Sequence, residues 1–141
     1  MRINREIIFR GKRKLDNSWI YGSLLTEKFI DDEEYLCCEI CLCDVYPETV
    51  GQFIGLTDKN GNKIFEGDIV VFNKTRNLPN KTVVPEVIGW NQGDCAFQRF
   101  PRGCCVTKGG AGKLVQPDMM SECEIIGNIY DDKKLLEEGL L

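Results

Sequence analysis

The sequence predicts a mainly β protein whose short strands form a small barrel or sandwich. Of its 141 residues, 14 are glycines, and this content favours frequent turns between short strands over long helices. Aromatic and β-branched residues gather in short runs that turn-forming residues separate. The hydrophobic share of 43% and the charged share of 28% are ordinary for a soluble globular domain. A core can therefore form without a metal or a disulfide.

Residues 1–48 are expected to form an N-terminal β-hairpin or extended segment. Alternation of apolar residues predicts a first strand at 5–10, which Gly11 is expected to end. A polar loop at 12–18 contains Asp16-Asn17, a typical turn pair. The run from Trp19 to Leu25 predicts a second strand.

An acidic, exposed segment is predicted at 26–34, followed by an alternating strand at 36–43. The two faces of that strand are expected to carry Leu36, Cys38, Ile40 and Leu42 on one side and Cys37, Glu39, Cys41 and Cys43 on the other. Tyr46-Pro47 ends the element, because proline donates no hydrogen bond and restricts the residue before it.

Residues 49–141 are predicted to be the larger, barrel-forming part. The expected strands are 52–56, 64–65, 69–72, 83–90, 95–100 and 124–130. Asp58-Lys59-Asn60-Gly61 gives the strongest turn signal, and Glu66-Gly67-Asp68 is predicted to be a second tight turn. A mobile loop is expected at 101–118, and Asp131 is expected to cap a short helix that runs through Glu138, with Leu135 and Leu136 docking it.

Charge is divided unevenly along the chain. Six basic groups and one acidic group give residues 2–14 a local charge of +5, whereas nine acidic groups against Lys28 give residues 15–50 a local charge of −8. The net charge of the chain is −4. A basic arm beside an acidic stretch favours self-association over binding to polyanions in general.

The eight cysteines raise the hypothesis of a metal site, centred on Cys37, Cys38, Cys41 and Cys43. No second Cys-x-x-Cys follows, the chain has no histidine, and the strand alternation directs Cys38 away from Cys41. We therefore expect no metal and interpret the thiols as small buried side chains. Residues 107–114 lack the first glycine and the Ser/Thr of a phosphate loop, and residues 58–69 lack the glycine and glutamate of a calcium loop.

Enzymatic activity is not expected, because a thiol nucleophile would have no histidine to activate it. A single-stranded nucleic acid is the alternative ligand, since small barrels bind strands with basic grooves and aromatic platforms. The residues predicted for that role are Arg10, Lys12, Arg13, Lys14, Trp19 and Tyr21. The isoelectric point near 5.0 disfavours it.

The segment TVGQFIGLTDKNGNKIFEGDIV, residues 49–70, resembles the central signature of the YopX family, and Ile126-Gly127-Asn128-Ile129-Tyr130 resembles its closing strand. Residues 5–10 and 19–22 lie where that family places an N-terminal hairpin. The resemblance implies a phage- or prophage-encoded protein whose part 49–141 is an SH3-like barrel. It supplies no catalytic residues.

Together these observations predict a non-enzymatic accessory protein that acts by binding, either as a homo-oligomer or to a host or phage protein. No cofactor is expected. The opening residues lack the apolar core of a signal peptide, and no apolar run approaches the length of a membrane span. We therefore expect the protein in the host cytosol.

Overall fold

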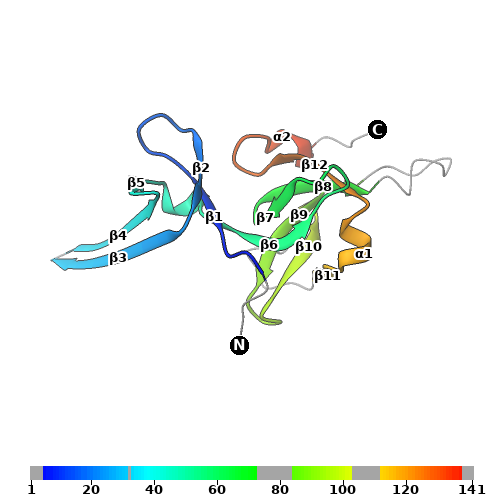
Figure 1. Cartoon of the computed structure of the whole chain (residues 1–141), viewed down its shortest axis with the longest axis horizontal. Helices are drawn as coiled ribbons and strands as arrows, with labels where there is room; N and C mark the ends of the chain where they lie inside the picture. The colour runs from blue at the N-terminus through cyan, green and yellow to red at the C-terminus, as the bar shows by residue number, and fades with distance from the viewer. Residues whose placement is uncertain (1–4, 32, 73–83, 103–111, 138–141) are drawn as a thin grey trace. The chain divides into compact units, whose positions relative to one another are not determined.

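The computed structural model describes residues 5–31, 33–72, 84–102 and 112–137 and divides the chain into two compact units, 1–55 and 56–141. The division falls within strand β6 (Gly51–Thr57), later than the boundary after residue 48 that the sequence suggests. Strands dominate both units (Figure 1), so the predicted mainly β class is confirmed.

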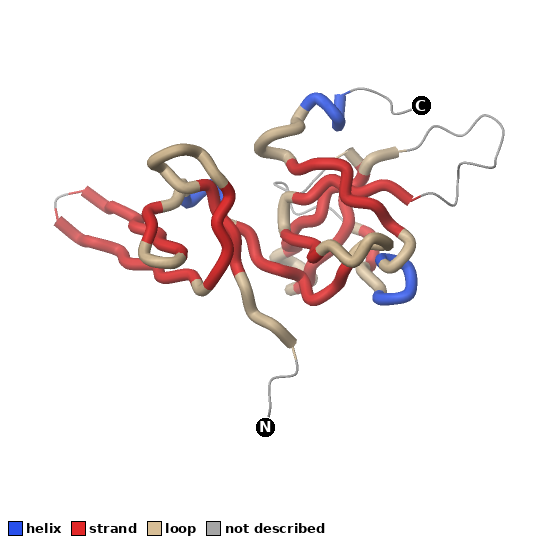
Figure 2. Tube along the Cα trace, turned by 45° about the horizontal axis from the view of Figure 1, so that its top comes forward, coloured by secondary structure: helices blue, strands red, loops and turns tan. Residues whose placement is uncertain are grey.

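The first unit consists of short antiparallel strands. They are β1 (Phe9–Lys12), β2 (Trp19–Gly22), β3 (Leu24–Asp31), β4 (Glu33–Ile40) and β5 (Cys43–Asp44), followed by a 3-10 turn η1 (Pro47–Thr49) and the start of β6. β1 pairs with β2 and with β6, and β3, β4 and β5 form a second sheet. The β3–β4 hairpin, whose strands have 8 residues each, forms a long ribbon (Figure 2).

The core of the first unit is built on Cys38, Ile40 and Val45, with partly buried apolar residues packed around them. Cys38 and Ile40, which were predicted to share one strand face, are both buried. The prediction that Gly11 ends the first strand is wrong, because Gly11 lies inside β1. A Cβ at Gly11 would lie 3.1 Å from the Cβ of Val45, so the missing side chain lets β1 pack closely on the core.

Two other expectations for this unit need correction. No strand was predicted at 26–34, but residues 26–31 belong to β3 and residues 33–34 belong to β4. The strand predicted at 36–43 ends at Ile40, and Cys41 (φ 52°) and Leu42 (φ 61°) form a two-residue turn that pairs Ile40 with Cys43. A two-residue turn with positive φ at both positions matches the twist of paired strands, and its usual sequence is Asn-Gly. Cys41-Leu42 is not such a pair, so the residue types did not predict this turn.

The second unit holds the elements β7 (Lys63–Phe65), β8 (Asp68–Phe72), β9 (Glu86–Asn91), β10 (Ala96–Pro101), β11 (Lys113–Leu114), α1 (Pro117–Met120), β12 (Cys123–Asn128) and α2 (Lys134–Glu137). Five of its strands form an antiparallel sheet of order β11-β10-β9-β8-β12, which curls into a half-barrel. Its fully buried side chains include Ile64, Ile69, Val70, Val87, Ile88, Phe100 and Met120. The SH3-like description of this unit stays a prediction.

The turn predicted at Glu66-Gly67-Asp68 is confirmed, and Gly67 is its critical residue. Gly67 has φ 88°, and a Cβ there would lie 2.9 Å from a ring carbon of Tyr130. Its N–H donates to the carbonyl of Ile88 at 2.7 Å, and its carbonyl accepts from the N–H of Ile129 at 2.9 Å. The glycine therefore joins the turn to two other parts of the unit.

Two predictions near the C-terminus are only partly right. The described part of the loop predicted at 101–118 contains β11 and the start of α1, while 103–111 lie outside the described residues. The terminal helix exists as α2 but begins at Lys134, so Asp131 is not its cap. Asp131 instead accepts a hydrogen bond from the side chain of Asn128 at 3.1 Å, which stabilises the turn after β12.

Candidate functional site

Four of the six residues predicted to bind nucleic acid share one face of the β1–β2 hairpin. The register places Lys12 opposite Trp19 and Arg10 opposite Tyr21. Because side chains alternate along a strand, these four lie on the face opposite to Phe9 and Ile20, which pack on the core. The sequence therefore identified a real cluster.

The geometry of this cluster is that of internal packing. The guanidinium carbon of Arg10 lies 4.7 Å from the centroid of the Trp19 ring, and Nζ of Lys12 lies 5.5 Å from it. Arg10 is only 6% exposed. Since the indole already stacks with cations of its own chain, base stacking on Trp19 would have to compete with them. Of the two aromatic residues, Tyr21 is half-exposed and Trp19 is partly buried.

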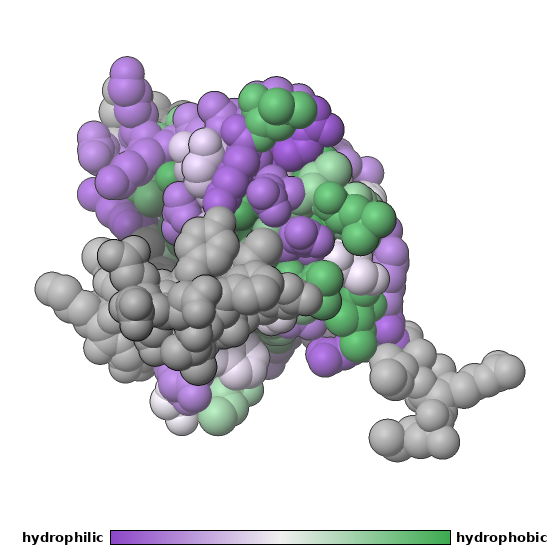
Figure 3. All heavy atoms as spheres, turned by 90° about the vertical axis from the view of Figure 1, so that its left-hand side faces the viewer, coloured by the Kyte–Doolittle hydropathy of each residue, from purple (hydrophilic) through white to green (hydrophobic). Residues whose placement is uncertain are grey.

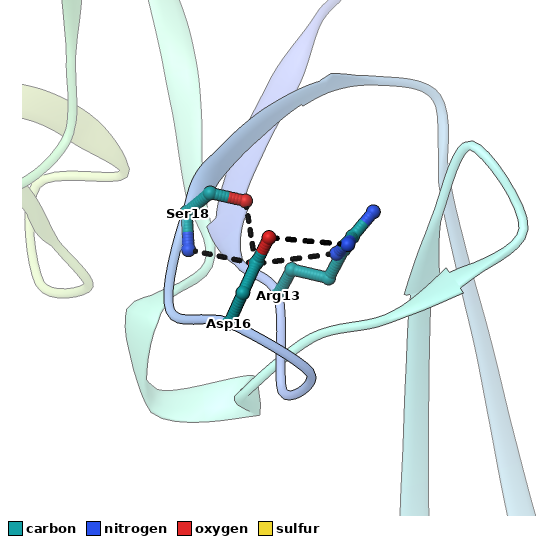
Figure 4. A network of polar contacts seen from close by, with 3 residues as sticks. All are labelled: Arg13, Asp16 and Ser18. Carbon is teal, nitrogen blue, oxygen red and sulfur yellow. Dashed lines mark hydrogen bonds and ion pairs between the residues drawn. The ribbon is translucent and has the colours of Figure 1, made fainter.

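The other two predicted residues, Arg13 and Lys14, belong to the β1–β2 loop. Arg13 forms an ion pair with Asp16 at 3.1 Å, and Asp16 also accepts hydrogen bonds from the N–H and the hydroxyl of Ser18 (Figure 4). The bonds from Ser18, and then the charge of Arg13, hold the pKa of Asp16 below its usual value. The turn predicted at Asp16-Asn17 is confirmed, with Asn17 at φ 60°.

This loop lies against strand β5. The N–H of Lys14 donates to the carbonyl of Asp44 at 2.9 Å. A shallow pocket of about 410 Å³ is lined by Arg13, Lys14, Leu15, Cys43 and Asp44. At its edge the side chain of Leu15 is 82% exposed, which leaves a large apolar group in water between charged neighbours.

A second exposed leucine sits on the β4–β5 turn. Leu42 is 89% exposed, and with the half-exposed Leu25 it lines a further pocket of about 450 Å³. The other lining residues are Ser23, Leu24, Glu39 and Cys41. We call Leu15, Leu25 and Leu42 the leucine surface of the first unit. Figure 3 views the molecule from the side on which β3–β5 are drawn in Figure 1, and hydrophobic side chains surface there at separate places among hydrophilic ones.

The leucine surface was missed by sequence reasoning. The sequence pattern places Leu42 on one strand face with Cys38 and Ile40, and it places Leu15 in a polar loop. A usable signal was present for Leu15, because a leucine inside a run of charged and turn-forming residues has no strand face on which to be buried. Leu42 had no such signal, since its exposure depends on a turn that its own residue type disfavours.

The cysteines that the structure describes are dispersed. Cys38 and Cys123 are buried, as expected for small apolar side chains, whereas Cys41 and Cys95 are exposed and Cys43 is half-buried. Burial, followed by the nearby charge of Asp58, raises the pKa of the Cys123 thiol to about 12. Among the described residues, no three histidine, cysteine or acidic side chains are placed to hold a metal ion.

These features define a mainly β protein of two units whose first unit exposes apolar turns. Residues 8–137 match the family described as YopX protein, and the chain belongs to the YopX family. It is also similar in fold to protein EF1440 from Enterococcus faecalis, a crystal structure that superposes with a TM-score of 0.55 at 20% identity, over 94% of this chain and 99% of that one. A comparison with curated proteins found no match. No helix in the described part of the chain is long and apolar enough to cross a membrane.

Proposed function

We propose that this protein is a phage- or prophage-encoded accessory protein that works by binding, without catalysis, and that a second copy of the chain is its partner. The observation that carries the proposal is the exposure of Leu15 and Leu42 on two turns of the first unit. Exposed apolar groups beside pockets and rimmed by charges are typical of protein contact surfaces.

Charge supports a second copy as the occupant. Arg13 and Lys14 precede Leu15 and line its pocket together with Asp44, while Glu39 lines the pocket beside Leu42. A two-fold contact uses the same surface on both subunits, so a surface that carries both basic and acidic side chains can complement itself. The sequence charges of +5 at 2–14 and −8 at 15–50 extend the same polarity beyond the pockets.

Light scattering across protein concentration and salt tests this proposal. The native protein is expected to show a mass above that of the monomer, and the mass should fall as salt rises, because exposed charges are screened beyond about 8 Å at physiological ionic strength. The double variant Leu15→Ser, Leu42→Ser should be monomeric. A monomer mass for the native protein under every condition would refute self-association.

Leu114 provides the matched control, because it is an exposed leucine (66%) in the second unit. Leu114→Ser should leave the mass of the native assembly unchanged. If both the double variant and the control keep the native mass, the assembly uses another surface and the leucine surface is not the contact.

A further inference from the structure

The second unit contains an open cleft that the proposed self-association does not use. Its volume is about 560 Å³, which is within the range of small-molecule sites. The lining residues are Phe72, Glu86, Arg99, Lys113, Gln116, Asp118, Met119 and Glu122. They come from β8, β9, β10, β11 and the segment around α1.

The floor of the cleft is a buried ion pair. Nη1 of Arg99 donates to Oε2 of Glu86 at 2.8 Å, and the side chains are only 9% and 7% exposed. Nε of Arg99 donates to the carbonyl of Leu114 at 2.9 Å, and the guanidinium lies 4.9 Å from the ring centroid of Phe72. These contacts fix the plane of the guanidinium on three sides.

One nitrogen of this guanidinium is left for a ligand. Within the described residues, Nη2 of Arg99 has no hydrogen-bonding partner, and the side chain of Arg99 is 9% exposed. A fixed guanidinium with an available N–H group in a concave site is a strong hydrogen-bond donor to a carboxylate. Because the fold already holds the side chain of Arg99 in place, ligand binding costs little of its conformational entropy.

Lys113 adds a second cation at the same place. Its Nζ lies 3.3 Å from Oε1 of Glu86, so each oxygen of Glu86 contacts a different cation. Two positive groups against one carboxylate leave a net positive charge at the floor. The side chain of Lys113 is 55% exposed, so it can turn toward a ligand without breaking the buried pair.

The rim of the cleft has the opposite sign and an apolar wall. Asp118 and Glu122 are the acidic lining residues, and Met119 and Phe72 are the apolar ones. We propose that this cleft binds a small zwitterion of the amino-acid or dipeptide class. Arg99 and Lys113 would hold its carboxylate, the acidic rim would attract its ammonium group, and Phe72 and Met119 would contact an apolar side chain.

Titrations followed by amide chemical shifts test the proposal with three matched probes: the dipeptide leucyl-leucine, its C-terminal amide and its N-acetyl derivative. We expect leucyl-leucine to shift the signals of Arg99, Gln116 and Met119 with millimolar affinity. The amide and the N-acetyl derivative should each bind at least about tenfold more weakly, since one charged contact of about 1.4 kcal/mol is a factor of ten.

Lys113→Gln is the informative variant, because its exposed side chain can change without removing the buried pair. It should weaken leucyl-leucine binding several-fold, whereas Lys133→Gln, an exposed lysine outside the cleft, should leave binding unchanged. The proposal is overturned if leucyl-leucine causes no shifts at these residues. It is equally overturned if the amide or the N-acetyl derivative binds as well as the free dipeptide, or if Lys113→Gln binds like the native protein.

Discussion

Two turns, one in each unit, reverse a strand in opposite ways. In the first unit, the β4–β5 turn places Cys41 and Leu42 at positive φ, with both side chains exposed. In the second unit, the turn before β8 uses Gly67, and the buried carboxylate of Asp68 accepts the N–H of Phe65 at 2.8 Å. Non-glycine residues at positive φ cost about 1–2 kcal/mol each, and such strain is typical of functional sites. The β4–β5 turn therefore combines backbone strain with exposed side chains, whereas the turn at Gly67 avoids the strain and is held by backbone hydrogen bonds.

The largest effect is expected from Gly67→Val, which attacks a turn of the second unit. Valine there must adopt φ 88° and overlap Tyr130, so we expect a loss of about 4 kcal/mol in the free energy of unfolding or no folded protein. Urea unfolding measures it. Gly61→Ala is the control, since Gly61 has φ 80° but open space around it, and should cost only about 1 kcal/mol. Equal losses for the two variants would show that the contact with Tyr130 is unimportant.

Asp58→Ala should have the next largest effect. The carboxylate of Asp58 accepts the backbone N–H groups of Asn60, Asn62 and Ile125 at 2.9, 2.9 and 3.2 Å, so we expect a loss of about 2–3 kcal/mol. Burial raises the pKa of Asp58, but these donors outweigh it and lower the pKa from 3.8.

The lowered pKa of Asp58 fixes the sign of its pH dependence. Its contribution is complete above the unfolded-state pKa near 3.8 and is lost as the pH falls below that value through the folded-state pKa. Thermal unfolding of the native protein and Asp58→Ala should therefore converge as the pH falls below 3.8. A difference in melting temperature that stays constant down to pH 2, roughly two units lower, would contradict this assignment.

Leu42→Gly tests the β4–β5 turn of the first unit, where Leu42 has positive φ. Glycine adopts positive φ without strain, so the variant should be more stable by about 1 kcal/mol, the reverse of Gly67→Val. The same change removes an exposed leucine and should weaken self-association. Unfolding and light scattering on one sample measure both. A Leu42→Gly protein that is less stable than the native one would show that the turn is not strained.

The smallest effect is expected for nucleic acid. Trp19 already stacks with Arg10 and Lys12, so a fluorescent single-stranded oligonucleotide should show little or no binding at low salt. Lys12→Glu with Lys14→Glu should then change nothing measurable, and these residues suit the test better than the buried Arg10. Salt-dependent binding that the double variant abolishes would restore nucleic acid as a ligand.

The elements that the sequence predicted well are those whose signals are local. The Asp58–Gly61 turn and the Glu66-Gly67-Asp68 turn carry their own glycines, and β8 is a continuous apolar run. Gly11 was misassigned because its role depends on Val45, which is distant in the sequence. β11 was missed because a long-range hydrogen bond from Arg99 holds its Leu114 carbonyl.

The candidate site divides in the same way. The basic and aromatic residues 10–21 were recognised from their types, and pairing of β1 with β2 does bring four of them together. Composition could not indicate that Arg10 would be buried or that Leu42 would be exposed, because burial is decided by what the rest of the fold places next to a residue. The residue types predicted that the basic and aromatic side chains cluster, but tertiary packing determined which of them are buried and which are exposed.

The pairing of β8 with β12 has a consequence for how the chain folds during synthesis. Asp68 pairs with Asn128, so the sheet of the second unit stays incomplete until residue 128 has been made. The pairs of the first unit join strands that are closer in sequence, the farthest being β1 with β6. Local pairs form faster than distant ones because less chain entropy is lost in closing the loop. On the ribosome, we therefore expect the first unit to fold early. The edge of β8 that pairs with β12 stays unpaired until β12 has been synthesised, and an unpaired strand edge can pair wrongly with other chains.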